Sequence, residues 1–477
     1  MNRPIRRLFA VFALLVALLV VYTTRWTVFE ATSLRTNALN RRSLLEEQHI
    51  PRGPIVAADG TVLARSVRGP EGVYSRLYPT GELFAHPVGY HFTDLGNSGI
   101  EAYENTALSG QTREGVQSLL DQLQGIEPVG EKVVTTLDPA AQRVATQELG
   151  SYHGAVVALE PKSGAVEVMA STPSYDPNVL RDPAQYSKLA TDNETAPLIN
   201  RATQFGYAPG STFKVVTATA AIDSGKFTKE SLVNGKNGIA VSGVPLNNDY
   251  NQSFGEISLK TALAQSVNTV WAQVAEKVGK PTMQQYMERF GFDSKPQLDY
   301  PEEQMSASGV YAGERLLEPT SPLVDIGRVG IGQGHLEATA MQMAQVASAV
   351  ADHGVLMRPH LTSRVVNHEG QVVRTVEPSV QSDVMKRSTA EQVREMMEAV
   401  VNEGTGTPAQ IPGIQVAGKT GTAETQVGSE NNNVWFIAFA PAREPRVAVA
   451  VTVQHVPGFG ATYAAPIAKR VIESLLG

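Results

Sequence analysis

The chain has 477 residues, no cysteine, and a formal net charge of -7 at pH 7. This length exceeds what one ordinary hydrophobic core supports, so two or three domains are expected. The lack of cysteine excludes disulfides, thiolate metal sites and a cysteine nucleophile. The negative charge argues against nucleic acid as a partner.

The first segment predicts a membrane anchor. Arg3, Arg6 and Arg7 precede an uncharged, mostly apolar run from Leu8 to Thr24. At about 1.5 Å per residue, a helix over this run is about 26 Å long, the lower limit for crossing a bilayer core. No small-residue cleavage site follows, and more arginines precede the run than follow it. This favours an uncleaved anchor with its N-terminus inside the cell over a cleaved signal peptide or a buried core helix.

Three parts are predicted along the chain. Residues 1–25 form the cytoplasmic tip and the anchor of a single-pass membrane protein. Frequent glycine and proline, as in Pro51 to Ala64, predict a small irregular module outside the membrane over residues 26–138, with a polar helical stretch near Arg113 to Gln124. Residues 139–477 form the larger domain.

Two hairpins flank a long helical region in this larger part. Residues 154–171 contain two β-rich runs around a Pro-Lys-Ser-Gly turn, and residues 433–454 repeat the pattern around Pro-Ala-Arg-Glu-Pro. Helices are predicted between them, as at 258–265 and 337–354, and a last helix at 464–476. Strands at both ends of a helical insert predict an α+β domain, in which helices pack on an antiparallel sheet of distant segments.

The segment Tyr207–Val216 reads YAPGSTFKVV and brings a serine and a lysine to the start of a predicted helix. Residues three apart on a helix share a face, so the Lys214 amine can reach the Ser211 hydroxyl. A serine nucleophile needs a proton acceptor. Lysine can accept that proton if burial or a second cation lowers its pKa from about 10.4 to about 7. The alternative is a capping serine beside a solvated lysine.

A second segment interrupts two helical runs with Ser266 and Asn268. Residues two apart in a loop can face one cavity, where the hydroxyl relays a proton and the amide holds a substrate carbonyl or the lysine. A capping serine is the ordinary explanation for such a pattern.

A third segment, Val416–Glu424, contains Lys-Thr-Gly-Thr after a β-like entry. Lys419 and Thr420 can bind a carboxylate. Gly421, without a Cβ, lets a substrate backbone lie against a strand edge, and the amide of Thr422 would point toward the reacting carbonyl.

The order Ser-x-x-Lys, Ser-x-Asn, Lys-Thr-Gly is the motif set of penicillin-binding proteins and class A β-lactamases. With these residues, the chain resembles class B penicillin-binding proteins, most closely those of actinobacteria. The likeness covers nearly all of the chain and includes RGPIVAADGTVLA, YPTGELFAHPVGY, VVTTLDPAAQ, STPSYDPN, NRATQFGYAPGSTFK, GIGQGHLEATAMQMA and KTGTAE.

The resemblance implies a penicillin-binding transpeptidase domain, with a five-stranded antiparallel sheet, flanking helices and a helical subdomain, above a pedestal- or dimerisation-like N-terminal module. It implies a D,D-transpeptidase outside the cell membrane that cross-links peptidoglycan stem peptides from lipid-linked precursors during cell-wall growth or division. β-Lactam antibiotics would acylate the same serine.

The resemblance also implies roles for the motif residues. Ser211 would attack the D-Ala-D-Ala carbonyl and Lys214 would take its proton, while Ser266 would pass a proton to the departing D-alanine. Asn268 would hold the donor peptide. Lys419 and Thr420 would bind the terminal carboxylate. The backbone amides of Ser211 and Thr422 would form the oxyanion hole.

Two departures from the family patterns refine this expectation. The middle motif is Ser-Val-Asn rather than Ser-Asp-Asn, and no glutamate followed by Leu-Asn lies at β-lactamase spacing after Asn268. The nearest acidic candidate, in the segment 301–308, lacks the asparagine, so a β-lactam adduct should persist. The N-terminal module is too short for a glycosyltransferase domain. The resemblance implies that the glycan-polymerase partner is a separate membrane protein of the SEDS family, contacted by the anchor and the module.

No cofactor and no metal is expected. The glycine run Gly327–Thr339 lacks the strand and acidic residue of a nucleotide site, and the histidines are too dispersed for a metal pair. Two alternatives to the transpeptidase are kept: a D,D-carboxypeptidase that uses water as acceptor, and a non-enzymatic β-lactam sensor or scaffold of wall synthesis.

Overall fold

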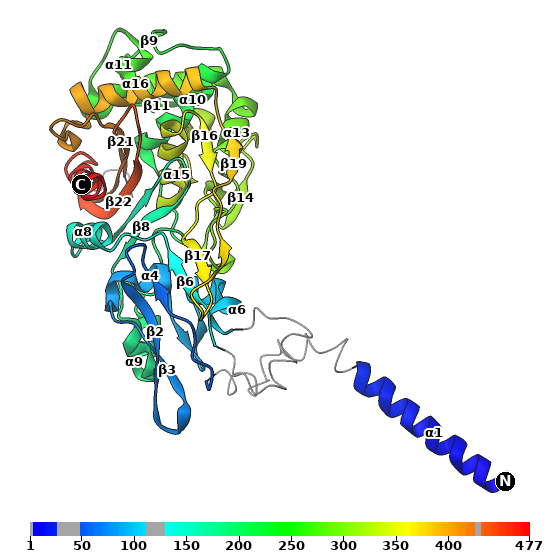
Figure 1. Cartoon of the computed structure of the whole chain (residues 1–477). Coiled ribbons are helices and arrows are strands. Elements are labelled where there is room, and N and C mark those ends of the chain that lie inside the picture. Colours follow the sequence, from blue (N-terminus) through cyan, green and yellow to red (C-terminus); the bar gives the residue numbers. More distant parts are fainter. Residues whose placement is uncertain (1–2, 26–47, 111–128, 425–430) are drawn as a thin grey trace.

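The larger part of the computed structural model, which describes residues 3–25, 48–110, 129–424 and 431–477, is built on a five-stranded antiparallel sheet (Figure 1). Its order is β20-β21-β22-β7-β8. β7 (Gly154–Leu159) and β8 (Val166–Thr172) form the first predicted hairpin, and β21 (Asn431–Ala440) and β22 (Val447–Pro457) form the second. β20 (Ala417–Glu424) pairs with β21 and forms one edge. The predicted antiparallel sheet of distant segments is confirmed.

Helices cover both faces of this sheet. Successive side chains of a strand point to opposite faces, and on β22 Val449 and Val451 pack into the core shared with α8 (Pro139–Leu149) and α17 (Ala464–Leu476). Ala448 and Ala450 pack into the other core, which contains α10 and α15. Burial on both faces explains why these strands are almost continuously apolar.

The central helix of the second core is α10 (Lys214–Asp223), in which every residue is buried. It contacts α12 (Asn268–Val278), α13 (Lys280–Arg289) and α16 (Arg387–Glu403), while α15 (Ala340–Ala351) packs on the sheet. The predicted helix at 258–265 is α11 (Leu259–Ala264). The larger part is therefore an α+β domain, as predicted.

Smaller elements surround these layers. The short strand pairs are β4 (His91–Phe92) with β5 (Gly96–Asn97), β9 (Leu232–Asn234) with β12 (Glu256–Ser258), β10 (Ile239–Val241) with β11 (Val244–Leu246), β16 (Val355–Met357) with β19 (Val380–Asp383), and β13 (Gly309–Ala312) with both β14 (Arg315–Leu317) and β15 (Leu336–Glu337). The short helices are α4 (Ala85–Val88), α5 (Gly99–Tyr103), α6 (Asn105–Leu108), α9 (Pro183–Thr191) and α14 (Ile326–Val329).

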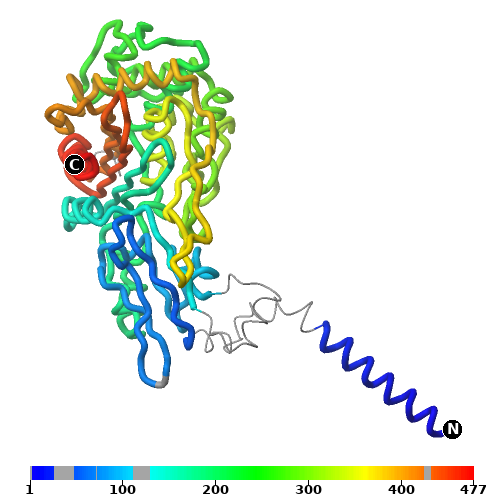
Figure 2. The backbone as a smooth tube through the Cα atoms, viewed as in Figure 1, coloured from blue at the N-terminus to red at the C-terminus, as the bar shows by residue number. Residues whose placement is uncertain are grey.

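A second sheet, which the sequence analysis did not predict, joins the N-terminal part to the rest. Its order is β18-β17-β6-β1-β2-β3. The N-terminal strands are β1 (Ile55–Val56), β2 (Val62–Arg68), β3 (Tyr74–Leu77) and β6 (Lys132–Thr135), and the sheet is completed by β17 (Thr362–Val366) and β18 (Val372–Thr375). Figure 2 shows the yellow segment beside the blue and cyan strands.

This shared sheet explains why the N-terminal module reads as irregular in sequence. The strands of the module are short, and β6 forms its antiparallel pairing with β17, which lies more than 200 residues later in the sequence. The division at residue 138 stays a prediction, because β6 and β17 pair across it. The polar helical stretch predicted near Arg113 to Gln124 lies outside the described residues.

The N-terminal run forms α1 (Arg3–Thr24), and none of its residues is buried. Within the described part of the chain, it is the one helix long and apolar enough to cross a membrane. A role as a core helix does not fit this exposure. Helix length and composition do not distinguish the anchor from a signal peptide.

A buried ion cluster holds the N-terminal segments together. Glu101, in α5, is fully buried, and its carboxylate lies 2.6 Å from Arg52 Nε and 2.5 Å from Arg76 Nε. Burial alone would raise the pKa of Glu101, but the guanidinium groups of Arg76 and Arg52 lower that pKa to about 2. The carboxylate is therefore ionised and is the shared counterion of two buried guanidinium groups.

We expect Glu101→Gln to lower the free energy of unfolding by about 3 to 5 kcal/mol, because it leaves two buried guanidinium groups without a counterion. Denaturant unfolding of both proteins measures this loss. Since the pKa of Glu101 is lowered from 4.5 to about 2, the stability difference should be full above about pH 4.5 and decline toward pH 2. Glu369→Gln, at a side chain that is 57% exposed, is the control. Equal stability of the wild type and Glu101→Gln would contradict the prediction.

Candidate active site

Ser211 lies at the N-terminal end of a helix, as predicted. It belongs to a 3-10 turn, η5 (Gly210–Phe213), that continues directly into α10. Gly210 has φ +52°, and a Cβ on this residue would lie 2.5 Å from the carbonyl oxygen of Thr422. Glycine is required here by both conformation and space. The serine segment can thus lie against β20.

The glycine of the Lys-Thr-Gly motif serves the same contact. A Cβ on Gly421 would lie 2.6 Å from the carbonyl oxygen of Pro209 and 2.9 Å from a methyl carbon of Thr212. The expectation that the missing Cβ leaves room for a substrate backbone is therefore corrected: the space is filled by the serine segment. Gly332, from the glycine run near residue 330, is similar, since its Cβ would lie 1.9 Å from the oxygen of Gly210.

Lys214 is fully buried behind Ser211. Its Nζ donates to the carbonyl oxygen of Ser266 at 2.8 Å, to Ser266 Oγ at 3.2 Å and to Asn268 Oδ1 at 2.6 Å. Among the described residues no hydrogen bond joins it to Ser211, so the reach of this amine to the Ser211 hydroxyl stays a prediction. A buried amine needs acceptors, and the turn at Ser266 offers three oxygens where the serine hydroxyl would offer one.

The turn between α11 and α12 is shaped by the backbone of Ser266. This residue is buried and has φ +57°, a conformation rare for residues with a side chain. Its carbonyl and hydroxyl oxygens both reach Lys214. Asn268 begins α12, and its amide nitrogen donates to the oxygen of Asn247 at 3.2 Å and to Asp249 Oδ1 at 3.4 Å, which orients the side chain.

The third motif brings a second buried amine to the same hydroxyl. Lys419, on β20, is fully buried, and its Nζ donates to Ser266 Oγ at 3.0 Å and to the carbonyl oxygen of Thr420 at 2.9 Å. Thr420 Oγ1 lies 2.6 Å from Thr405 Oγ1. Segments separated by more than 50 and more than 150 residues thus meet at Ser266, as the motif order predicts.

The two amines are perturbed by their surroundings. Burial lowers the pKa of Lys214 to about 7, with Asp249 opposing the change. Burial and the charge of Lys214 lower the pKa of Lys419 well below its usual range. One amine can therefore be neutral near pH 7 and accept a proton. The Ser266 hydroxyl between the amines can carry that proton to or from the neighbouring space.

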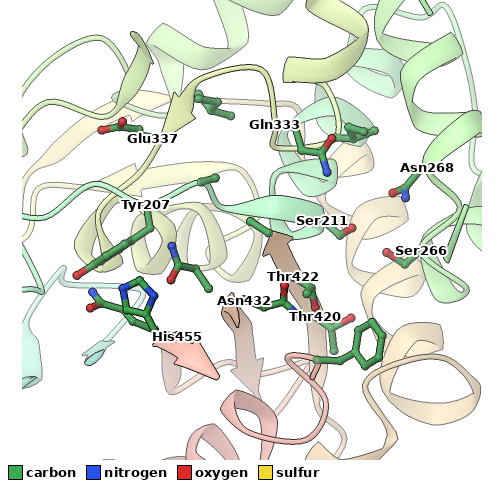
Figure 3. A pocket seen from close by; sticks show the side chains of 18 of the residues that line it. Tyr207, Ser211, Ser266, Asn268, Gln333, Glu337, Thr420, Thr422, Asn432 and His455 are labelled. Carbon is green, nitrogen blue, oxygen red and sulfur yellow. The ribbon is translucent and has the colours of Figure 1, made fainter. Parts of the chain in front are cut away.

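All of the motif residues except the buried Lys214 and Lys419 border one open cleft with a volume of about 1830 Å³ (Figure 3). Its lining includes Ser211, Ser266, Asn268, Thr420, Gly421 and Thr422. In Figure 3, Ser266 and Asn268 lie on one side of Ser211. On its other side, the cleft extends into an arm that is bordered by Tyr207 and His455.

The sequence analysis missed two polar residues of the site. Asp249 acts on the pKa of both lysines, and Thr405 orients the Thr420 hydroxyl. Asp249 lies in a short 3-10 turn, η6 (Asp249–Asn251), and Thr405 follows α16. Neither Asp249 nor Thr405 belongs to one of the three motifs or lies at a fixed spacing from them, so no local signal in the sequence identifies these residues.

Comparison with known proteins identifies the family of the chain. Residues 154–473 match the penicillin binding protein transpeptidase domain, and residues 52–133 match the penicillin binding protein A dimerisation domain. The chain is 33% identical over 501 residues to the peptidoglycan D,D-transpeptidase PbpA of Mycolicibacterium smegmatis, covering 100% of this chain and 99% of the relative.

Solved structures are similar as well. The ceftriaxone acyl-enzyme complex of penicillin-binding protein A from M. tuberculosis has 32% identity and a TM-score of 0.81, over 91% of this chain and 100% of that chain. The D,D-transpeptidase domain of a peptidoglycan glycosyltransferase from Eggerthella lenta has 31% identity and a TM-score of 0.78, over 90% and 98%. The chain therefore belongs to the penicillin-binding protein transpeptidases, a family of serine acyl-transferases.

Proposed function

We propose that this protein is a peptidoglycan D,D-transpeptidase. The Ser211 oxygen attacks the carbonyl of D-Ala-D-Ala in a donor stem peptide, the amide C–N bond breaks, and D-alanine leaves with a proton. The amine of an acceptor peptide then attacks the ester, which forms the cross-link and frees Ser211. The observation that carries this proposal is the Ser266 hydroxyl, which accepts hydrogen bonds from the buried amines of both Lys214 and Lys419 beside Ser211.

The proton path follows from these contacts. Neutral Lys214 accepts the proton of Ser211, and the Ser266 hydroxyl passes a proton to the nitrogen of the departing D-alanine. Because Lys214 is hydrogen-bonded to Ser266 rather than to Ser211, substrate binding or a small movement of the Ser211 side chain must complete the first step. Apo hydrogen bonds in active sites are commonly longer than those of the reacting complex.

Binding of the donor uses the remaining motif residues. The amides of Ser211 and Thr422 form the oxyanion hole, a role supported by the close approach of Gly210 to Thr422. One such donor is worth about 3 to 4 kcal/mol in the transition state. Lys419 and Thr420 bind the terminal carboxylate, and Asn268 holds the donor peptide.

We expect labelled penicillin to form a covalent adduct on Ser211, detected by intact-mass spectrometry and mapped by peptide mass. Ser211→Ala should abolish the adduct, because this serine lines the cleft beside Ser266, whose hydroxyl bonds to both buried amines. Lys214→Ala should also lose it with the fold retained, while Ser187→Ala, at an exposed serine of α9, should label normally. An unmodified wild-type protein would contradict the proposed function. Product analysis with an acceptor amine separates a transpeptidase from a carboxypeptidase.

The acylation rate should rise with pH, with a midpoint near 7, because the neutral form of Lys214 is the active base and burial lowers its pKa to about 7. Asp249 stabilises the charged amine, so Asp249→Asn should lower this pKa and move the midpoint to lower pH. Stopped-flow acylation by a chromogenic β-lactam measures the profile. Asp94→Asn, at an exposed residue of the N-terminal part, is the control. A midpoint that Asp249→Asn leaves in place would refute the assignment of the base.

The organisation of the chain is also proposed. Residues 1–25 anchor the protein in the cell membrane, residues 26–138 form a non-catalytic pedestal- or dimerisation-like module, and residues 139–477 form the transpeptidase domain outside the cell. Helix α1 supports the anchor by its length and composition. A SEDS-family glycan polymerase is the proposed partner. If this is right, such a polymerase should co-purify with the full chain.

The absence of natural cysteine allows a direct test of the topology. A single cysteine at Leu323, a side chain 74% exposed, should react with a membrane-impermeant maleimide in intact cells. A cysteine at Arg3, on the cytoplasmic side of the anchor, should react only after the membrane is opened. The reverse pattern of labelling would overturn the proposed orientation.

A further inference from the structure

One arm of the cleft contains a buried cation that the proposed reaction does not use. Arg201 is 3% exposed and lines the cleft. Its guanidinium donates to the carbonyl oxygens of Ala196 at 3.2 Å and Thr195 at 2.7 Å, and its Nε has no hydrogen-bond partner in the described part of the chain. Within the described ranges no carboxylate forms an ion pair with it. A buried charge without a counterion is costly, so this arm is suited to an anionic group of a ligand.

A β-bulge brings more polar groups into the same arm. Val434 pairs with Val453 and Asn432 with Val456, so that Gln454 and His455 together oppose a single residue of β21. His455 has φ +53°. A bulge breaks the alternation of a strand and redirects side chains, commonly beside active sites. Both Gln454 and His455 therefore line the cleft, although they are consecutive residues.

Asn432 and the opposing residue, Asn433, also line the cleft although they are consecutive. Among the residues that the structure describes, the oxygen Oδ1 of each has no hydrogen-bond partner, and neither has Nε2 of Gln454, a residue that is 7% exposed. Buried polar atoms in native proteins are almost always paired. The donors of Arg201 and Gln454 match a carboxylate, and the two amide oxygens match an N–H donor such as an ammonium group.

The wall of the arm is aromatic and held in place. The rings of Phe205 and Tyr207 stack with centroids 5.0 Å apart, and Tyr207 meets Trp435 edge-on at 6.2 Å. Trp435 Nε1 donates to the oxygen of Ala208 at 3.0 Å, within the segment that leads to Ser211. This wall can bury the methylene groups of a long side chain, while the polar atoms bind its end.

The position of the arm along β20 indicates which part of the donor reaches it. In the proposed function the terminal carboxylate binds at Thr420 and the reacting carbonyl lies beside Thr422. The next residue of the strand, Ala423, pairs with Asn433. A peptide extended along this edge advances about 3.3 Å per residue, so the residue that precedes D-Ala-D-Ala lies next to the arm.

We propose that the arm formed by Arg201, Asn432, Asn433, Gln454 and His455 binds the side chain of the residue that precedes D-Ala-D-Ala in the donor, and that this side chain ends in a carboxylate with an adjacent ammonium group. Arg201 and Gln454 hold the carboxylate, and the two asparagine oxygens accept from the ammonium. This inference rests on the proposed function and names the substrate class of that site.

The test is competition with labelled penicillin for Ser211, which needs no turnover of the peptide. The competitors are N-acetylated X-D-Ala-D-Ala tripeptides in which X is meso-diaminopimelate, its side-chain amide, or L-lysine. The concentration of the diaminopimelate peptide that halves penicillin labelling of Ser211 should be about 10- to 100-fold lower than that of the other two peptides. The reason is that only this peptide carries a carboxylate on the side chain of X, which can form a charged hydrogen bond in the arm.

Two variants test the residues of the arm. The preference is the ratio of the half-protecting concentrations of the amide peptide and the diaminopimelate peptide. Arg201→Gln and Gln454→Leu should reduce this ratio toward 1, whereas Arg443→Gln, at an exposed turn residue, should leave it unchanged. The preference is a ratio within one protein, so a smaller folded fraction of a variant cancels. If Arg201→Gln does not fold, Gln454→Leu decides.

The outcomes separate this inference from the function on which it rests. A wild-type protein that takes up penicillin but binds the three peptides equally would overturn the inference alone, as would a preference that persists in both variants. A carboxylate preference found only when the peptides act as acceptors would overturn the assignment to the donor. A wild-type protein that takes up no penicillin would overturn the proposed function and the inference together.

Discussion

The site depends on one hydroxyl oxygen that serves two buried amines. Ser266 Oγ accepts from Lys214 at 3.2 Å and from Lys419 at 3.0 Å. Removing two ammonium groups from water is expensive, and the site offsets this cost with carbonyl, hydroxyl and amide oxygens from Ser266, Asn268 and Thr420. The compensation is incomplete, so the pKa of both lysines falls. A base that works at neutral pH results from this imbalance.

The fold holds this arrangement in place through contacts that tolerate no side chain. Gly210 and Gly421 let the serine segment lie directly against the edge strand β20, and Gly332 closes the other side of Gly210. The edge strand belongs to a sheet buried on both faces, and the serine segment begins a helix whose residues are all buried. Neither element can shift without disturbing a packed core. The serine and the proposed oxyanion donor are therefore fixed relative to each other.

The N-terminal part is joined to the rest of the protein by backbone hydrogen bonds as well as by packing. Strands β6 and β17 pair between them, and the carboxylate of Asp299 accepts from the backbone N–H groups of Leu361 at 2.5 Å and Thr362 at 2.7 Å. Glu104 accepts from the Thr362 hydroxyl at 3.0 Å. The β6–β17 pairing and the Glu104–Thr362 bond cross from the N-terminal segments to the chain after α15, and Asp299, itself outside the N-terminal part, holds the backbone at the same place. This favours a stiff connection over a hinge.

The sequence by itself determined the local structure: the helix that starts near Ser211, the two hairpins, the apolar helix at the N-terminus and the order of three motifs. These features follow from spacing and turn residues within short segments. Only the tertiary structure decided that Lys214 bonds to Ser266 rather than Ser211, and that Gly421 makes room for protein rather than substrate. Sequence spacing also did not reveal the six-stranded sheet, or that Nε of the buried Arg201 has no hydrogen-bond partner among the described residues. The physical reason is range, because each of these features depends on atoms brought together from distant segments, where local periodicity carries no information.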